Sequence, residues 1–363
     1  MRVNLIGPMF STSGYANHFR GLANALGKLI DVKITTQLFP QWELQCNDLE
    51  LDMINKQDDK DRANLLIDLP MNWKQYASKK QNVAWLVWEG DKIPLSWLDC
   101  IADQKITRVL VPSAHVYDAI KNTATNEWWM LNRNKIGLVP HGINLNIFRP
   151  LDINKELFTF ICNKGFRGEL DRGGLQHSIR AFISEFNKGE ARMLVKLNPA
   201  YAIGPAELNI LLEKYRLEEG KSMEKMPEIM FHLGVVSPKE IADIYNAGHV
   251  FVNSTEGEAF SLPSLEAMGC GLSVIATNFG GQIDFVNGTN GYLIDYDLKP
   301  VEHELMYQGV SWARPRIPDL RRLMRLVKED LEITKIKGEN ALKTAKQYTW
   351  ENSAQKLIEL LKQ

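Results

Sequence analysis

Cysteine is scarce in this sequence, with four residues among 363. They lie far apart, form no CxxC pair and have no histidine at the spacing of a metal site. A disulfide framework and a structural zinc site are therefore not indicated. Reduced thiols are typical of cytoplasmic proteins, so we expect a cytoplasmic location. The four positions are Cys46, Cys100, Cys162 and Cys270.

A surplus of charge is also missing, because 43 basic residues balance 44 acidic ones and the net charge is −1. No nucleic-acid partner is expected, and any anion site must be local. No apolar run approaches the roughly 20 residues that span a bilayer, and the N-terminal apolar stretch is too short for a signal peptide. With 45% hydrophobic residues and 15 prolines, the composition excludes a disordered or collagen-like chain.

The length favours two domains over one core. Short apolar runs alternate with helical patterns throughout, as in βα units with parallel strands, which predicts the α/β class. The helix after the first strand has its apolar stripe at Tyr15, Phe19, Leu22 and Leu26. In the first half, strands are expected at Val3–Ile6, Val32–Thr36, Asn64–Leu69, Val83–Trp88, Arg108–Val111 and Ile136–Val139.

The same alternation restarts near Leu151, after a join that contains two prolines and a glycine. We therefore predict two doubly wound Rossmann-like domains that face a cleft: 1–150 plus the closing helix 349–363, and 151–348. The closing helix has an apolar stripe at Trp350, Ala354, Leu357 and Leu361. In the second half, strands are expected at Phe158–Cys162, Met193–Lys196, Ile229–His232, Val250–Asn253 and Gly291–Ile294, and helices near Leu175–Phe186, Ala206–Leu217 and Pro238–Ala247.

The stretch 253–277 is the most informative about function. Its pattern predicts a strand, a loop of small residues, a helix that opens at Pro263, a glycine stop and another strand. Backbone amides at such a loop bind anions and polarised hydroxyls. Glu258 in the loop and Glu266 in the first helical turn then face one site, and carboxylates suit adjacent sugar hydroxyls. Taken alone, the pair could equally be ordinary acids of a helix N-terminus.

The segment from Glu258 to Glu266 resembles the Glu-x7-Glu motif of glycosyltransferase family 4, the retaining GT-B enzymes also described as glycosyl transferases group 1. The resemblance continues through the glycines and the strand that follow. It implies the GT-B fold and a nucleoside-diphosphate sugar as donor, with Glu266 on the ribose hydroxyls. It also implies that Glu258 and its loop hold the donor sugar; the loop residues are Gly257, Ala259, Phe260, Ser261 and Leu262.

Weaker resemblances lie elsewhere in the chain. Gly14 resembles the family glycine that lets the backbone approach the diphosphate or sugar, although neither a P-loop nor a GxGxxG pattern is present. Gly234 and Val235 lie in a segment similar to the one that meets the nucleobase. The glycine turn at Gly280 and Gly281 is similar to the one near the phosphates. Both of these segments could equally be tight βα turns.

A departing diphosphate needs cations or backbone amides to take up its charge. Lys164, Arg167 and Arg172 resemble the family's basic loop after the first strand of the second domain, and Lys196 is a weaker candidate. The alternative is a solvated loop paired with its own acids. Two Asp-x-Asp triplets, at 59–61 and 295–297, lack a third ligand, so we expect metal-independent chemistry and no cofactor.

Trp88-Glu89 stands where many members of the family carry a histidine or His-Asp. The role of that histidine is not carried over, and Glu89 is the candidate that takes part instead. The alternative is an acid that simply opens a loop. His115 and His141 are expected to be structural or capping residues.

The sequence thus predicts a retaining glycosyltransferase that moves a sugar to a hydroxyl of a saccharide, glycan or lipid-linked acceptor. A nucleotide-sugar epimerase or phosphorylase of GT-B fold, and a non-catalytic sugar-nucleotide-binding protein, remain alternatives. Membrane contact is expected to be peripheral at most, through the basic stretch 314–346, whose default interpretation is a solvated helix face. The nucleotide, sugar, acceptor and oligomeric state are not specified.

Overall fold

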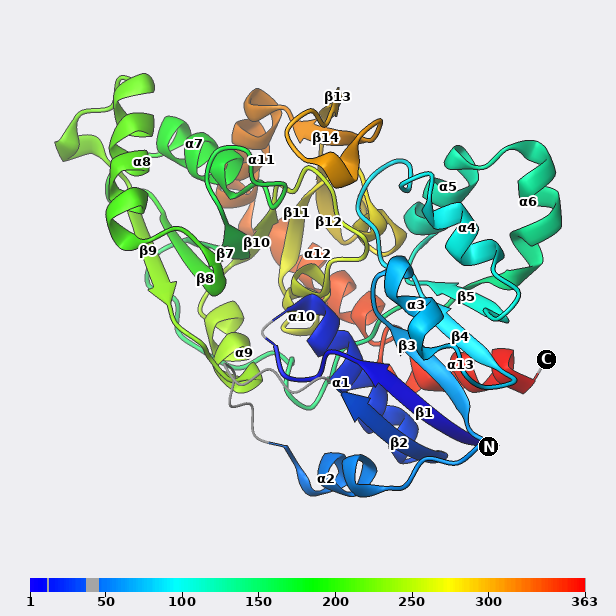
Figure 1. Ribbon diagram of the computed structural model, residues 1–363. Helices are drawn as coiled ribbons and strands as arrows, with labels where there is room; N and C mark the ends of the chain where they lie inside the picture. The colour runs from blue at the N-terminus through cyan, green and yellow to red at the C-terminus, as the bar shows by residue number, and fades with distance from the viewer. Residues whose placement is uncertain (12, 37–45, 363) are drawn as a thin grey trace. The chain divides into compact units, whose positions relative to one another are not determined.

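The computed structural model describes residues 1–11, 13–36 and 46–362. Within them the chain divides into two compact units, each built on its own parallel sheet (Figure 1). The first unit holds the chain up to Asn144, the segment 300–311 and the chain from Tyr348; the second holds 145–299 and 312–347. Our predicted division placed 300–311 in the second domain. The structure assigns this segment to the first unit because it packs on the loop that contains Trp88.

The described residues of the first unit form a six-stranded parallel sheet in the order β2-β1-β3-β4-β5-β6. Every residue of β3 and β4 is buried, as parallel sheets covered on both faces require. All six strands predicted for this half are present. The elements are β1 (Arg2–Gly7), α1 (Gly14–Gly27), β2 (Asp31–Thr36), α2 (Asp48–Asn55), β3 (Ala63–Ile67), α3 (Pro70–Tyr76), β4 (Asn82–Trp85), α4 (Trp97–Ala102), β5 (Arg108–Val111), α5 (Ala114–Thr123), α6 (Asn126–Asn132), β6 (Ile136–Leu138) and α13 (Trp350–Lys362).

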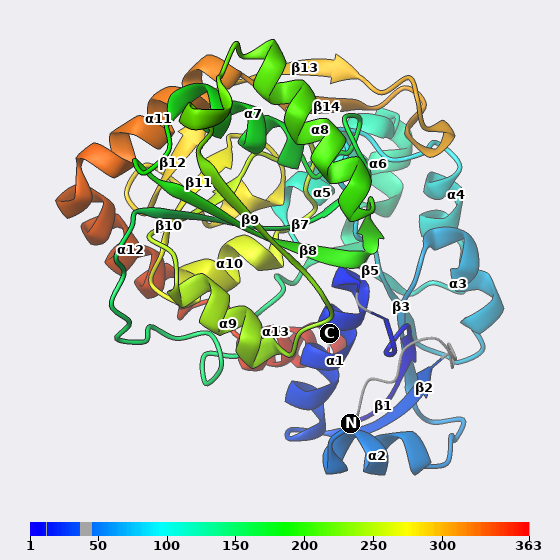
Figure 2. The same cartoon turned by 90° about the vertical axis from the view of Figure 1, so that its left-hand side faces the viewer.

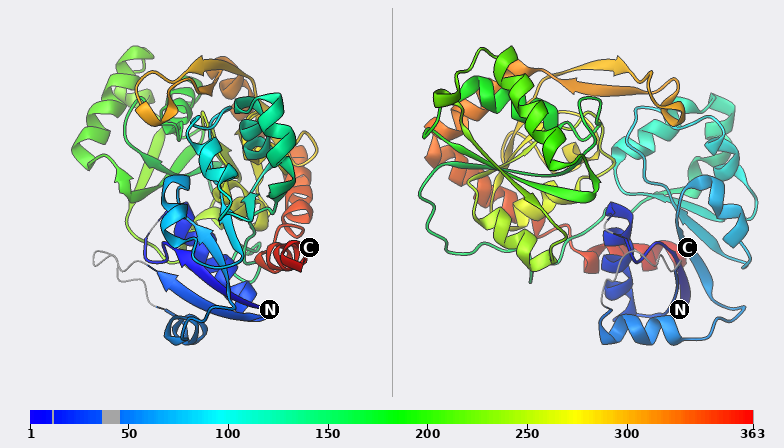
Figure 3. Two further views of the ribbon diagram at one scale, coloured as in Figure 1. Left: turned by 45° about the vertical axis from the view of Figure 1, so that its right-hand side comes forward. Right: turned by 60° about the vertical axis from the view of Figure 1, so that its left-hand side comes forward.

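The described residues of the second unit form another six-stranded parallel sheet, in the order β12-β11-β10-β7-β8-β9. Helices cover both of its faces (Figures 2 and 3). The strands β13 (Tyr296–Pro300) and β14 (Ser311–Pro315) pair as a separate ribbon. The other elements are β7 (Thr159–Phe166), α7 (Leu175–Glu185), β8 (Arg192–Ala202), α8 (Pro205–Glu218), β9 (Glu228–Leu233), α9 (Pro238–Asn246), β10 (Val250–Asn253), α10 (Leu262–Gly269), β11 (Ser273–Thr277), β12 (Gly291–Ile294), α11 (Ile317–Glu329) and α12 (Leu331–Ala345).

Helical stripes predicted from the sequence pack as expected in the first unit. In α1, Phe19, Leu22 and Leu26 are fully buried, and the four stripe residues of α13 are buried as well. Helices α1 and α13 contact each other (Figure 3). At this contact Trp350 lies on Gly21. A Cβ atom at Gly21 would lie 2.2 Å from Cε2 of Trp350, so glycine permits this close approach.

The core of the second unit is filled by aromatic rings. The rings of Phe160, Phe182 and Phe186 lie 5.3–5.7 Å apart and are fully buried. They fix α7 on the sheet beside β7. Among the helices that the structure describes, none has the length and apolar character needed to cross a membrane.

Candidate functional site

The topology of the second sheet marks one place for a ligand. The chain passes from β7 outward to β8 and β9, and then returns to β10 on the other side of β7. In doubly wound sheets, ligands bind outside the carboxyl ends of the strands at such a switch point. Lys164 lies near the end of β7, and the loop with Glu258 follows β10. Residues that are 94 positions apart in the sequence are thereby brought together.

The loop before α10 has a strained backbone. Ser261 has φ 78° and is the one residue other than glycine with a positive φ in the described chain. Its Oγ lies 2.9 Å from Asn253 Nδ2 and 2.9 Å from Ser264 Oγ, contacts that hold the turn. Helix α10 begins at Leu262, one residue before the predicted Pro263. Strain of this kind persists only where the surrounding structure holds the residue in place, and it clusters at ligand sites.

Arg172 holds the same loop from the other side. Its Nη1 donates a hydrogen bond of 2.6 Å to the carbonyl of Gly257, and its own carbonyl accepts from the amide of Glu256 at 2.8 Å. Gly174, with φ 74°, lets the chain pass so closely that a Cβ there would lie 1.9 Å from the carbonyl oxygen of Ser254. Arg172 thus supports the loop, and its role at a diphosphate remains a prediction.

Glu258 pairs with Lys164. The ammonium lies 3.2 Å from Glu258 Oε2, and the two side chains are 8% and 21% exposed. The backbone of Glu258 is fixed by the predicted glycine turn, because the amide of Gly281 donates to its carbonyl at 2.7 Å. Gly280 has φ 86°, and a Cβ there would lie 2.7 Å from the same oxygen. A carboxylate and an ammonium are therefore held side by side at the switch point.

Glu266 is buried in the fifth position of α10. We expected Glu266 in the first turn of a helix that opens at Pro263. That expectation was wrong, because α10 begins at Leu262 and its first turn ends before Glu266. Tyr245 Oη donates to Glu266 Oε2 at 2.9 Å, and Asn163 Nδ2 donates to Tyr245 Oη at 2.8 Å. Burial raises the pKa of Glu266 to about 7, although the bond from Tyr245 and the charge of Lys196 lower it. Burial also lowers the pKa of Lys196.

Neighbouring residues of one strand serve both glutamates. Asn163 reaches Glu266 through Tyr245, and Lys164 pairs with Glu258. The two acids therefore lie at the end of β7 with different partners: one pairs with a cation, and the other accepts a hydrogen bond from a phenol. Such a site can hold a ligand that offers hydroxyl donors and an anionic group.

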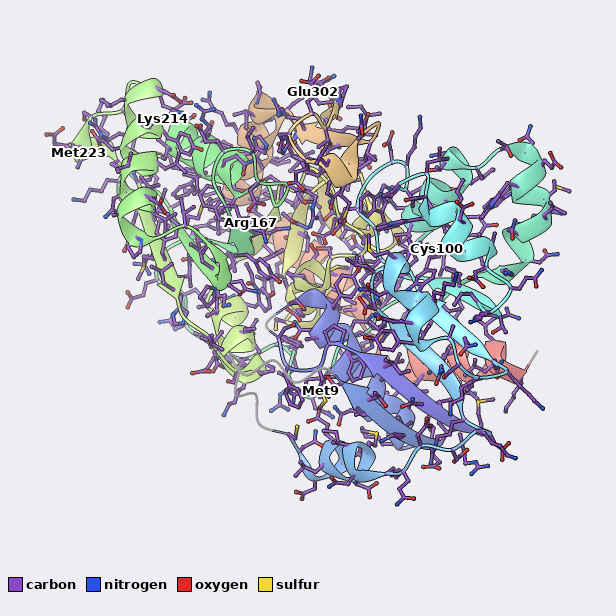
Figure 4. All side chains as sticks on the ribbon, in the orientation of Figure 1. Met9, Cys100, Arg167, Lys214, Met223 and Glu302 are labelled. Atoms are coloured by element: carbon purple, nitrogen blue, oxygen red, sulfur yellow. The ribbon has the colours of Figure 1, made fainter. Side chains whose placement is uncertain are left out.

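Arg167 is the more accessible cation of the basic loop. It is exposed on the second unit (Figure 4), and its guanidinium lies 5.0 Å from the ring centroid of Tyr201. A Cβ at Gly165 would lie 2.8 Å from Cβ of Tyr201, so glycine admits this ring. The extension of β8 beyond the predicted Lys196 delivers Tyr201.

Gly234 and Val235 follow β9, the edge strand of the sheet, two strands from β7. Val235 is 56% exposed. The nearest atom to a Cβ at Gly234 would be His232 Nε2 at 3.5 Å, which is ordinary contact. The chain itself therefore does not require glycine at this position, and contact with a nucleobase remains a prediction.

In the first unit, Gly14 opens α1 and is exposed. Among the described atoms, none lies within 4 Å of a Cβ built there. Ser13 caps the helix by accepting from the amide of Ala16 at 3.3 Å. The surroundings of Gly14 leave space for a ligand to approach the start of α1, and its role at the donor remains a prediction.

Glu89 follows β4 and has a partner that the sequence did not suggest. Tyr307 Oη donates to Glu89 Oε2 at 3.0 Å, and Nε2 of His115 lies 3.1 Å from the Glu89 carbonyl. His141 is buried beside the ring of His18, at 4.1 Å between centroids. Burial lowers the pKa of His141 to about 3, so it is neutral in the folded chain.

Sequence analysis also missed Glu256, which lies two residues before the Glu258–Glu266 motif. Its side chain is 7% exposed, with Oε1 2.6 Å from His177 Nε2 and 3.6 Å from Arg314 Nε. Its carbonyl accepts from the amide of Ala313 at 2.7 Å. These contacts fasten the loop to α7 and β14. The sequence gives little indication of these contacts, because His177 and Arg314 lie far from Glu256 along the chain.

Carboxylates of the two Asp-x-Asp triplets are paired with arginines. Asp59 and Asp61 contact Arg2, and Asp297 contacts Arg316. Within the described ranges, no three His, Cys, Asp or Glu side chains gather in a way that could hold a metal ion.

Residues 176–303 match the family model described as "Glycosyl transferases group 1". Over this range the chain is similar to the glycosyl transferases of group 1. The matched range contains both glutamates and the loop between them. The resemblance found in the sequence is thereby confirmed for this group, and the narrower assignment to family 4 remains a prediction.

Among curated proteins, a probable sucrose-phosphate synthase of Thermosipho melanesiensis is 27% identical over 236 residues, which cover 63% of this chain and 48% of that protein. The chain thus spans about half the length of this relative. Two solved structures share the fold over the whole chain. A sucrose-phosphate synthase from Thermosynechococcus elongatus has a TM-score of 0.70 at 17% identity, with coverage of 100% and 98%.

The second structure is Anabaena Alr3699/HepE in complex with UDP and glucose, which has a TM-score of 0.64 at 14% identity, with coverage of 100% and 99%. At these identities the likeness shows the fold alone. It confirms the α/β class and the GT-B architecture of two Rossmann-like units.

Proposed function

We propose that this group 1 chain transfers a sugar from a nucleoside-diphosphate sugar to an acceptor hydroxyl, with retention of anomeric configuration. The observation that carries the proposal is the switch point of the second sheet, where adjacent residues of β7 serve Glu258 and Glu266. The two acids differ in partner and in burial. This difference suits two parts of one ligand, a sugar beside Glu258 and a ribose beside Glu266.

Charge on the departing diphosphate is taken up by fixed groups in this proposal. Lys164 and the exposed Arg167 supply cations, and the start of α10 supplies backbone amides. Arg172 contributes by holding the loop in shape. No step needs a metal ion. Retention follows from attack of the acceptor hydroxyl on the face that the leaving group vacates.

Glu89 is the acceptor-side residue in this proposal. A carboxylate accepts hydrogen bonds from a sugar hydroxyl or from water, and orients that nucleophile. UDP is the first nucleotide to test, since UDP and glucose occupy the Alr3699/HepE structure. The acceptor class is a saccharide, a glycan or a lipid-linked sugar, and the expected location is the cytoplasm.

The test begins with UDP, ADP and GDP, each scored by thermal shift in EDTA and in Mg²⁺. UDP-glucose and the glucose conjugate of the best nucleotide are then tested for hydrolysis and for transfer to an acceptor panel, with the product anomer assigned by NMR. We expect one clear nucleotide, activity in EDTA and an α-linked product from an α-linked donor. Glu258→Gln should abolish turnover, while Glu213→Gln, an exposed acid paired with Arg216, serves as the control.

Three outcomes would replace the proposal. Conversion of the donor sugar without an acceptor would indicate an epimerase, and dependence on inorganic phosphate would indicate a phosphorylase. Tight nucleotide binding with no turnover, unchanged by Glu258→Ala, would indicate a binding protein.

A further inference from the structure

The segment 300–311, here called the arm, packs on the loop 88–92 of the first unit. The chain leaves the second unit after Lys299 and re-enters it at Trp312. Val310 reaches the loop at Gly90, where a Cβ would lie 2.1 Å from Cγ1 of Val310. The arm therefore packs so closely on the loop that only glycine fits at position 90.

Hydrogen bonds fix the register of the arm on the loop. The amide of Ser311 donates to Asp91 Oδ1 at 2.7 Å. Trp88 Nε1 donates to the carbonyl of Lys92 at 2.6 Å, which closes the loop on itself. The loop therefore presents Trp88 and Glu89 to the arm in a defined geometry.

Tyr307 is the arm residue that contacts both Trp88 and Glu89. Its ring stacks on Trp88, with centroids 4.5 Å apart and planes inclined by 17°. Its hydroxyl donates to Glu89 Oε2 at 3.0 Å. Both rings are buried, at 8% exposure for Tyr307 and 2% for Trp88. The stacked tryptophan fixes the phenol, and the phenol fixes one oxygen of the carboxylate.

The backbone of the arm is shaped to deliver this tyrosine. Leu305–Tyr307 forms a 3-10 turn, and the amide of Val310 donates to the Tyr307 carbonyl at 3.0 Å. Gly309 has φ 77°, a conformation that favours glycine. Leu305 is 94% exposed on the outer side of the turn while Tyr307 faces inward.

We propose that Tyr307 is a positioning residue that holds the Glu89 carboxylate in the orientation needed to receive the nucleophile. The inference rests on the proposed function, in which Glu89 orients the acceptor hydroxyl or water. A glutamate has three rotatable bonds, and placing a reacting group correctly contributes strongly to rate. Loss of the phenol therefore acts on turnover more than on donor binding.

The test uses Tyr307→Phe, which removes one oxygen and keeps the ring on Trp88. Tyr292→Phe is the matched control, because the hydroxyl of this buried tyrosine lies 3.0 Å from Thr334 Oγ1 in the second unit. Hydrolysis of UDP-glucose, or of the donor that performs best in the nucleotide panel, is measured for both variants, for Glu89→Gln and for the double variant. Water serves as the nucleophile, so no acceptor needs to be known.

We expect Tyr307→Phe to lower kcat by about tenfold to a hundredfold and to leave the donor KM within about twofold, while Tyr292→Phe retains the wild-type rate. The double variant should be no slower than Glu89→Gln, since both changes remove the same function. Wild-type kcat in Tyr307→Phe, or fully multiplied losses in the double variant, would overturn the role of Tyr307 alone. A wild-type chain that turns over no donor would overturn the proposed function and this role together.

Discussion

Replacing Glu266 with glutamine should stabilise the free protein at alkaline pH and weaken its binding of nucleotide. The carboxyl is 9% exposed, and burial raises its pKa from the ordinary 4.5 to about 7. Because the pKa is higher in the folded state, the protonated acid contributes to the stability of the fold. This contribution is fully present below pH 4.5. That contribution is lost as the pH rises through 7. Glutamine resembles the protonated acid and retains the contribution at every pH.

The magnitude follows from the pKa difference. One pH unit corresponds to 1.36 kcal/mol, so ionisation of Glu266 costs up to about 3 kcal/mol at pH 8. We expect Glu266→Gln to match the wild type below pH 4.5 and to gain stability progressively up to pH 8. The assay is urea unfolding of the nucleotide-free chain between pH 4 and pH 8.5, followed by far-UV circular dichroism.

Glu50→Gln provides the contrast. Glu50 is also buried, but it pairs with Arg20 at 2.8 Å, so the amide removes the negative charge that faces the guanidinium. This variant should lose stability, by about 3 kcal/mol. A Glu266→Gln variant that is less stable than wild type at pH 8, or a difference that does not change with pH, would refute the reasoning.

Three further substitutions test the packing and the site. Gly21→Ala should lower stability by about 1–3 kcal/mol in a melting experiment, because its methyl group meets the ring of Trp350; an unchanged Tm would contradict the contact. Gly174→Ala should cost about 3 kcal/mol or more and weaken nucleotide binding, since both its φ of 74° and the Ser254 carbonyl oppose a side chain; proteolysis of the loop reports the change. Lys164→Met should reduce donor hydrolysis by about a hundredfold, and a rate close to wild type would exclude this cation from the site.

The fold was predictable where local pattern decides it. Apolar runs such as Val250–Asn253 could be assigned as strands because buried parallel strands are apolar on both faces. Glycine and proline marked the ends of α10 to within a residue. The extension of β8 to Ala202 was missed, because the residues after Lys196 lack an apolar run and pair through their backbone with β7.

The candidate site was predictable only in part. Glu258 and Glu266 lie eight positions apart in one motif, so both could be identified from the sequence as candidate site residues. Tyr245 and Tyr307 could not be found in this way. Tyr245 lies 21 residues before Glu266, and Tyr307 lies 218 residues after Glu89. Their partners are decided by helix packing and by the path of the arm, which no local spacing encodes.

The central claim is that the switch point of the second sheet binds a nucleoside diphosphate through Glu266. Calorimetric titration of UDP into the wild type and into Glu266→Gln at pH 8 tests it most directly, with ADP and GDP in parallel. A carboxylate that accepts ribose hydroxyls contributes about 1.5–3 kcal/mol, so the variant should bind the preferred nucleotide at least about tenfold more weakly. Equal affinity of both proteins for all three nucleotides would contradict the account.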